Sequence, residues 1–389
     1  MPTNTIPALK LLLQLLRIPG PSGHEKEILG FIGKYLRSLR LPGLVLRYDN
    51  SHRRIGTGET GNLIANLPGT LNAPRRFLCA HADVVDMVAG CVPVVRGKFI
   101  APEGKTALGA DDRAGIAAIL HALTRIAKEK LPHPPLSVAF TVQEEKGLRG
   151  ARFINYGFLK EPVMGFNFDG DHMDLCIGAP FAFRFRVEFQ GIASHAGDAP
   201  EKGVSAALLF ASAANDLQRR GLWGALRDRA GRQVGTANIG VVKGGEATNI
   251  VMPRITVAGE ARSHSKKYLQ GLTRTYEKSF SWAARSIRNS AGQTGRADYS
   301  CEWVYPGFRL SKDAACVRIA ARQLALQGHH AKMLVEFGGL DANFFNHHRI
   351  PTVTLGCGAE NAHSTDERII IPEFLKVCEA ALGICTGKE

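Results

Sequence analysis

The stretch VAFTVQEEKG, residues 138–147, carries a run of apolar and β-branched residues directly into two adjacent glutamates, Glu144 and Glu145. A short apolar run bounded by polar residues predicts a buried strand, and the glutamates mark its end. Similar runs alternate with helical patterns along the chain: the runs lie at 77–80, 163–169 and 351–356, and the helical patterns include 112–130 and 312–327. This alternation predicts the α/β class, with a largely parallel sheet covered by helices on both faces in an α/β/α sandwich.

A different pattern occupies the middle of the chain. FAFRFRVEFQ, residues 181–190, alternates large apolar side chains with small or polar ones, which predicts a strand with one face in water. The elements expected after it are a helix at 203–220, strands at 235–242 and 254–262, a helix at 266–288 and a strand at 297–304. The order βαββαβ is that of a ferredoxin-like unit. We therefore expect a domain at 180–305, inserted between two parts of one α/β domain, 1–179 and 306–389.

Composition excludes several classes of protein. The net charge is +14, but Lys and Arg stand in ones and twos, so we expect no nucleic-acid partner. No stretch approaches the roughly 18 apolar residues that cross a bilayer, and we expect no membrane partner. Lys10 and Arg17 interrupt the apolar start, which favours a first helix docked on the core over a signal peptide. The eight cysteines form no CxxC pair, as is typical of reduced thiols, so we expect a cytoplasmic protein.

Polar residues follow the predicted strands where each strand ends. In a parallel α/β sheet, ligands bind beyond the carboxyl ends of the strands. Taken singly, these residues have ordinary explanations: a surface His-x-Asp pair, an Asp that caps a helix, a Glu-Glu pair in a solvated turn. The residues expected at this edge are His81, Asp83, Asp111, Asp112, Glu144, Glu145, Asp169 and His363.

Together these residues fit a metal site. Two His and at least three carboxylates match the ligands of a pair of Zn²⁺ ions, with Co²⁺ or Mn²⁺ as alternatives. Carboxylates that are brought together raise each other's pKa, so a cation must compensate them if they are to stay ionised. Two metal ions roughly 3.5 to 4 Å apart, sharing one carboxylate, would supply that compensation.

The motifs HAD, GADDRAG, QEEKG, NFDGD and AHSTDE, in this order and spacing, resemble those of the dinuclear zinc exopeptidases of the tripeptidase T and carboxypeptidase G type. The resemblance covers nearly the whole chain and implies a catalytic α/β domain with an inserted lid and dimerisation domain. It implies that His81 and Asp169 bind the first zinc, that Glu145 and His363 bind the second, and that Asp111 bridges both. It further implies that Glu144 is the general base and that Asp83 orients His81.

The reaction that the resemblance implies is the hydrolysis of short peptides. A metal-bridging water, deprotonated by Glu144, would attack the scissile carbonyl, and Glu144 would pass the proton to the leaving amine. In the inserted domain the resemblance implies three substrate contacts. Arg262 would pair a substrate carboxylate, Asn249 would add a hydrogen bond, and His195 would reach an oxyanion across a homodimer. Without the resemblance, these three would be a strand Arg in a salt bridge, a turn Asn and a surface His.

Three functions remain open. The first is a metallo-aminopeptidase acting on short peptides. The second is a related amidohydrolase or carboxypeptidase that cleaves N-acyl or glutamate-type amides. The third is a non-catalytic binding protein, which would lack a ligand, whereas all five are present. The segment around His363 resembles the family's dipeptidases and amidohydrolases, and TALGADDRAG at 106–115 resembles its tripeptidases, so peptide length also remains open.

Overall fold

The computed structural model describes residues 7–387. The chain divides into two compact units. Unit 1 comprises the described residues up to Ala179 together with those from Phe308 onward, and unit 2 is Pro180–Gly307. The predicted end of the inserted domain, residue 305, is the last residue of a strand in unit 2, and the next two residues also belong to that unit.

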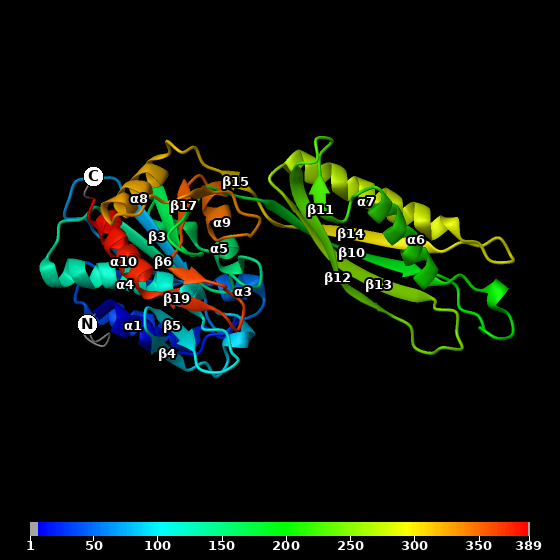
Figure 1. The fold of residues 1–389 in the computed structure, drawn as a ribbon, viewed down its shortest axis with the longest axis horizontal. Coiled ribbons are helices and arrows are strands. Elements are labelled where there is room, and N and C mark those ends of the chain that lie inside the picture. Colours follow the sequence, from blue (N-terminus) through cyan, green and yellow to red (C-terminus); the bar gives the residue numbers. More distant parts are fainter. Residues whose placement is uncertain (1–6, 388–389) are drawn as a thin grey trace. The chain divides into compact units, whose positions relative to one another are not determined.

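Within the described residues, unit 1 is built on an eight-stranded mixed sheet (Figure 1). Its strands are, in spatial order, β1 (Val45–Tyr48), β2 (Leu63–Leu67), β6 (Leu136–Thr141), β3 (Arg76–His81), β7 (Met164–Phe168), β17 (Thr352–Leu355), β8 (Leu175–Cys176) and β16 (Met333–Leu334). The central strands β6, β3, β7 and β17 run parallel. Antiparallel pairing occurs between β1 and β2, between β2 and β6, and between β17 and β8. The apolar runs of the sequence thus form the parallel centre of the sheet.

Helices cover both faces of this sheet. On one face, α4 (Ala110–Glu129), α8 (Ala315–Leu326) and α10 (Ile371–Thr386) pack together against the central strands, and α1 (Pro7–Leu15) packs on α4. Leu78 of β3 lies in this core. The preceding residue, Phe77, points to the opposite face, where its ring centroid is 4.6 Å from that of Phe345 in α9 (Ala342–His347). The predicted α/β class with both faces covered is therefore confirmed.

Shorter elements complete unit 1. They are the helices α2 (Lys26–Ser38), α3 (Ser51–Ile55) and α5 (Arg149–Phe153), the four-stranded sheet of β18 (Ala359–Glu360), β19 (Arg368–Ile370), β5 (Phe99–Pro102) and β4 (Pro93–Arg96), and the pair β15 (Phe308–Arg309) and β9 (Gly178–Ala179). The sequence pattern did not predict the four-stranded sheet, because strands this short carry little periodicity. The expected first helix is present as α1, with its leucines buried.

Unit 2 is an antiparallel sheet with two helices. Its described strands are, in spatial order, β11 (Gly224–Arg227), β12 (Gln233–Gly244), β13 (Arg254–Ser263), β10 (Phe181–Gln190) and β14 (Arg296–Tyr305), and its helices are α6 (Ala206–Arg219) and α7 (Lys266–Ser286). The alternation in β10 works as expected, since Phe183, Phe185 and Phe189 are buried while Arg184 and Arg186 are exposed. The short strand β11 is an addition to the predicted βαββαβ order.

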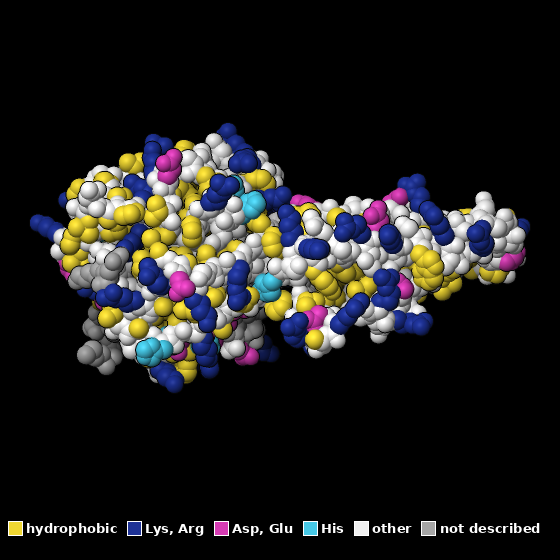
Figure 2. All heavy atoms as spheres, turned by 90° about the horizontal axis from the view of Figure 1, so that it is seen from above, with side chains coloured by type: hydrophobic (Ala, Val, Ile, Leu, Met, Phe, Trp, Pro, Cys, Tyr) yellow, Lys and Arg dark blue, Asp and Glu magenta, His cyan; other side chains and the backbone are white. Residues whose placement is uncertain are grey.

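Two further expectations concern membrane-spanning helices and the distribution of basic side chains. Among residues 7–387, no helix combines the length and apolarity needed to cross a membrane. Figure 2 shows Lys and Arg side chains scattered over the visible face of each unit, as the sequence distribution indicates.

Candidate metal centre

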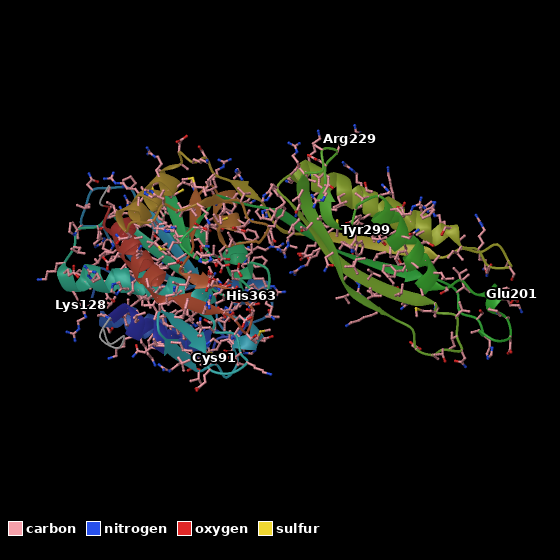
Figure 3. The ribbon with its side chains drawn as sticks, in the orientation of Figure 1. Cys91, Lys128, Glu201, Arg229, Tyr299 and His363 are labelled. Atoms are coloured by element: carbon pink, nitrogen blue, oxygen red, sulfur yellow. The ribbon has the colours of Figure 1, made fainter. Side chains whose placement is uncertain are left out.

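The parallel strands deliver the candidate side chains to one edge of the main sheet. His81 is the last residue of β3, Glu144 and Glu145 follow β6, and Asp169 follows β7 directly. Because the carboxyl ends of parallel strands meet at the same edge, these residues lie near one another. Asp111 comes from the first turn of α4, and His363 from the loop between β18 and β19 (Figure 3).

Four of the predicted ligands form a continuous chain of contacts through Asp111. Asp111 Oδ1 is 2.8 Å from His81 Nε2, and its Oδ2 is 3.2 Å from His363 Nε2. His363 Nε2 is also 2.8 Å from Glu145 Oε1. One ligand atom from each of His81, Asp111 and Glu145 lies within 4.8 Å of the others, which is a spacing that can hold a metal ion. Asp111 therefore stands between the two imidazoles, as a bridging ligand must.

The neighbouring aspartates are distinguished by what their oxygens contact. Asp112 is 1% exposed, and its carboxylate accepts the backbone N–H groups of His81 and Gly115, each at 3.0 Å. Its oxygens are engaged with the backbone, whereas those of Asp111 contact the imidazoles. Asp169 is buried, and burial, reinforced by the nearby Asp111 charge, raises its pKa to about 7. Asp169 is outside the three-residue group but close enough to sense its charge.

Asp83 holds the two glutamates through their backbone. Its Oδ1 accepts the N–H of Glu144 at 2.9 Å, and its Oδ2 accepts the N–H of Glu145 at 3.2 Å and the hydroxyl of Ser22 at 2.5 Å. His81 Nδ1 is 3.1 Å from the backbone carbonyl of Asp83 and 3.5 Å from its carboxylate. The predicted contact with His81 is therefore made chiefly by the carbonyl, and the carboxylate fixes the turn that carries Glu144 and Glu145.

The electrostatics of this edge favour a bound cation. Burial raises the pKa of Glu144 well above its usual value and that of Asp341 to about 6. The guanidinium of Arg113 is buried near the carboxylates of Asp83, Asp112 and Glu25, and burial lowers its pKa to about 10. One buried arginine cannot neutralise several carboxylates, and a divalent ion would favour their charged forms. Imidazole and carboxylate oxygens are donors that Zn²⁺ accepts, so the residues present fit such an ion.

The three substrate-contact candidates all lie in unit 2, in two separate places. His195 pairs with Ile250 in an isolated β-bridge, and the N–H of Ala196 donates to the carbonyl of Asn249 at 2.9 Å, so the segments of His195 and Asn249 lie side by side. Arg262 lies in β13, where its guanidinium contacts Glu260 Oε1 at 2.8 Å. The structure thus brings His195 and Asn249 together and leaves Arg262 apart from them.

Two buried acids near the site were missed by sequence reasoning. Asp341, at the start of α9, accepts a hydrogen bond from the hydroxyl of Thr141, and its Oδ1 has no hydrogen-bond partner among the described residues. Glu367 accepts three backbone N–H groups around Asp111. In a single sequence nothing distinguishes Glu367, which is 1% exposed, from its exposed neighbour Asp366.

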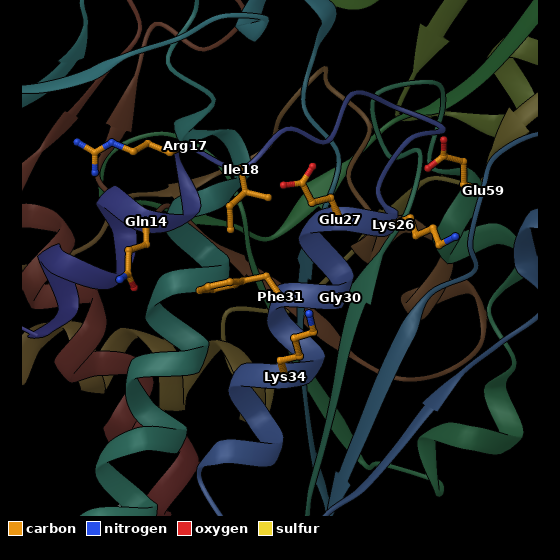
Figure 4. Close-up of a pocket in the computed structure, with 9 residues that line it drawn as sticks. All are labelled: Gln14, Arg17, Ile18, Lys26, Glu27, Gly30, Phe31, Lys34 and Glu59. Carbon is orange, nitrogen blue, oxygen red and sulfur yellow. The ribbon is translucent and has the colours of Figure 1, made fainter.

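A separate pocket lies away from the candidate metal ligands. A pocket of about 800 Å³ lies in unit 1 beside α2, with Phe31 and Ile18 among its apolar lining and Lys26 and Lys34 on its charged side (Figure 4). None of the predicted metal ligands lines it. The candidate metal site is therefore identified by its ligand chemistry, and this pocket is separate from it.

Comparison with known proteins agrees with this geometry. Residues 77–386 match the peptidase family M20/M25/M40. The protein YqjE of Bacillus subtilis (strain 168) is 32% identical over 378 residues, which cover 97% of this chain and 96% of that protein. A tripeptidase from Staphylococcus aureus subsp. aureus Mu50 superposes with a TM-score of 0.87 at 30% identity, covering 98% of both chains. The aminopeptidase PepT from Bacillus cereus ATCC 10987 superposes with a TM-score of 0.84 at 30% identity, covering 97% of both chains. The chain therefore belongs to the peptidase family M20/M25/M40, and its class of activity is peptide hydrolysis.

Proposed function

We propose that the protein is a zinc-dependent exopeptidase that removes residues from short peptides, with two Zn²⁺ ions per subunit. The observation that carries this proposal is the contact chain His81–Asp111–His363–Glu145 at the carboxyl edge of the parallel strands. The similarity to a tripeptidase and an aminopeptidase supports short peptides as substrates. Co²⁺ or Mn²⁺ could occupy the same donors.

Each candidate residue has a proposed role in metal binding or proton transfer. His81 and Asp169 would hold one ion, Glu145 and His363 the other, and Asp111 both. When bound, the ions would polarise the scissile carbonyl and lower the pKa of a water. A carboxylate oxygen of Glu144 then accepts a proton from the attacking water, and Glu144 gives this proton to the leaving amine. Asp83 keeps Glu144 in place through the backbone hydrogen bond of 2.9 Å. A side chain that is buried, with its pKa raised, suits a group that must accept and return a proton.

The tautomer of His195 supports its role as a donor to an oxyanion. The N–H groups of Gly197 and Asp198 donate to His195 Nδ1 at 3.2 and 3.0 Å. In the neutral ring, the proton must then reside on Nε2. His195 would thus present an N–H to the developing negative charge of the substrate carbonyl oxygen.

The spacing within unit 2 supports a homodimer in which subunits share their sites. The bridge of His195 to Ile250 lies just before Arg254, the first residue of β13, and Arg262 lies near the end of that strand. The strand between them is roughly 27 Å long, at about 3.4 Å per residue. A tripeptide spans at most about 11 Å. One subunit therefore cannot place both His195 and Arg262 on the same short substrate, and we propose that His195 and Asn249 serve the partner's site while Arg262 binds a carboxylate in its own.

The cysteines support a cytoplasmic location. All eight are unpaired in the described chain, and six of them are buried. Structural disulfides are typical of oxidising compartments, so their lack here favours a reducing one.

The decisive experiment is the incubation of the zinc-loaded protein with a library of dipeptides, tripeptides and N-acylated peptides, with products identified by mass. The proposal predicts release of free N-terminal residues from unblocked short peptides and no such release after removal of the metal with a chelator. Cleavage of N-acyl or glutamate-type amides alone would establish the amidohydrolase or carboxypeptidase alternative. No cleavage of any peptide by protein that binds two zinc ions would favour the non-catalytic alternative.

A further inference from the structure

The carboxylate of Glu367 spans the two segments that carry Asp111 and His363. Its Oε2 accepts the N–H of Leu108 at 2.7 Å and that of Gly109 at 2.9 Å, and its Oε1 accepts the N–H of Asp111 at 3.1 Å. These three donors precede or begin α4. We propose that Glu367 is a positioning residue of the metal centre, which fixes Asp111 and His363 at the spacing that lets both bind metal. This inference rests on the proposed metal site.

The turn that carries Asp111 needs an acceptor from outside α4. Asp111 and Asp112 have non-helical backbone angles, with ψ of 100° and 39°, and Gly109 has a left-handed φ of 76°. The first N–H groups of a helix have no partner within it, and here the surrounding residues are buried, so water cannot take that place. Glu367 is itself 1% exposed, and a carboxylate bonded to three amides at a helix N-terminus makes strong, charge-assisted contacts.

The loop that carries His363 needs an anchor of its own. His363 has a left-handed φ of 61°, which a residue with a side chain adopts only when its surroundings hold it there. Half of its side chain is exposed, so core packing does not supply that hold. Glu367 follows in the same loop, donates its N–H to the Ser364 carbonyl at 3.3 Å, and leads into β19, which pairs with β5. Its carboxylate therefore ties the His363 loop to the backbone of the Asp111 turn, in addition to the side-chain contact of 3.2 Å between His363 and Asp111.

The test compares three single variants of the full chain with the wild type. Glu367→Gln keeps the size of the side chain but replaces one acceptor oxygen with an NH₂ group, which would face backbone donors. Glu367→Asp keeps the charge with a shorter reach. Asp366→Asn is the matched control, because it makes the same chemical change as Glu367→Gln at the adjacent, exposed residue. Each protein is freed of metal, and stepwise Zn²⁺ affinity is measured by competition with a chelator, alongside the absorption spectrum of the Co²⁺-loaded protein.

We expect Glu367→Gln to weaken zinc binding about 10- to 100-fold and to change the Co²⁺ spectrum, because partners that orient metal ligands have effects of this size. Glu367→Asp should recover part of the affinity, and Asp366→Asn should match the wild type. If Glu367→Gln does not fold, as judged by circular dichroism of the metal-free protein, Glu367→Asp takes its place in the same measurement.

Two results separate this inference from the proposed function. If the wild type binds two zinc ions and the Glu367 variants, while folded, bind them with unchanged affinity and spectrum, the positioning role is wrong and the metal site stands. If the wild type itself binds no zinc, the proposed metal site is wrong, and the positioning role is overturned with it.

Discussion

Replacing Glu144 and Glu145 one at a time with Gln should separate a proton-transfer group from a metal ligand. The two residues are adjacent, and Asp83 holds both backbone N–H groups, so neither substitution disturbs the turn itself. Their side chains differ in what they contact. Glu145 Oε1 is 2.8 Å from His363 Nε2 and belongs to the group that can hold a metal, whereas Glu144 is outside that group.

The expected magnitudes follow from these roles. Gln at residue 144 has the same size and keeps the backbone hydrogen bonds, so only the ability to take a proton is lost. Loss of a general base lowers turnover by about 10²- to 10⁴-fold, equivalent to about 2.7 to 5.4 kcal/mol of activation free energy. Zinc content should stay at the wild-type value. In Glu145→Gln a neutral amide replaces a charged ligand, so the zinc content should fall together with the turnover.

The assay is steady-state cleavage of a tripeptide, with zinc measured by mass spectrometry on the same protein samples after dialysis. The control is wild-type protein carried through the same dialysis. Equal loss of zinc in both variants would mean that the roles of Glu144 and Glu145 are wrongly assigned. Full turnover by Glu144→Gln with two zinc ions bound would refute a base at this residue.

Three other results should follow from the structure. Asp111→Asn should reduce zinc at both sites and abolish cleavage, and a variant with two zinc ions and normal turnover would contradict the bridging role. His195→Ala should keep both zinc ions and lower kcat about 10²- to 10³-fold. An equal mixture of His195→Ala and Glu144→Gln proteins should recover about a quarter of wild-type activity after subunit exchange, because half of the dimers are hybrids and each hybrid has one intact site. No recovery would exclude sharing of sites between subunits. Glu25 precedes α2 and is fully buried, and its Oε1 accepts the N–H groups of Gly23 and Gln143. Burial raises the pKa of Glu25 from 4.5 to about 7, so the metal-free protein should lose stability as the pH rises through that range. The free energy of unfolding is measured in urea, with chelator present, at pH 5 and pH 8. The wild type should lose up to about 3 kcal/mol more than Glu25→Gln between these two pH values, and an equal loss in both proteins would refute the role of Glu25.

The sequence predicts the framework well because the main elements carry strong periodicity. Continuous apolar runs form the strands β3, β6, β7 and β17, which are covered on both faces of the sheet. Alternating apolar and polar residues form β10, which is covered on one face. The short strands β18 and β19 have too few residues to show a period, although their loop carries His363. Long, regular elements were therefore predictable, and the short sheet beside the site was not.

The site was predictable only as far as residue type and strand position reach. His81 and the glutamates stand at strand ends, where a polar residue after an apolar run is conspicuous. The acceptors of backbone N–H groups are invisible by this means, because any carboxylate can fill that role and the partners are far away in sequence. Asp83 illustrates the limit: the family resemblance implied that it orients His81, whereas its carboxylate chiefly holds the amides of Glu144 and Glu145.

The carboxylates at the strand ends, which made the site recognisable, also oppose the stability of the folded chain. A core selected for stability alone would bury apolar side chains at these strand ends, since burial of a carboxylate disfavours its charged form. Here Asp169 and Glu144 are buried with raised pKa values, whereas the buried Arg113 lies near other acids, Asp83, Asp112 and Glu25. A divalent cation that binds the folded chain but not the unfolded chain offsets this cost with its binding free energy. The instability of the metal-free site and the metal affinity that we propose for it therefore have one physical origin, which explains why local rules for a stable core fail at the candidate site residues.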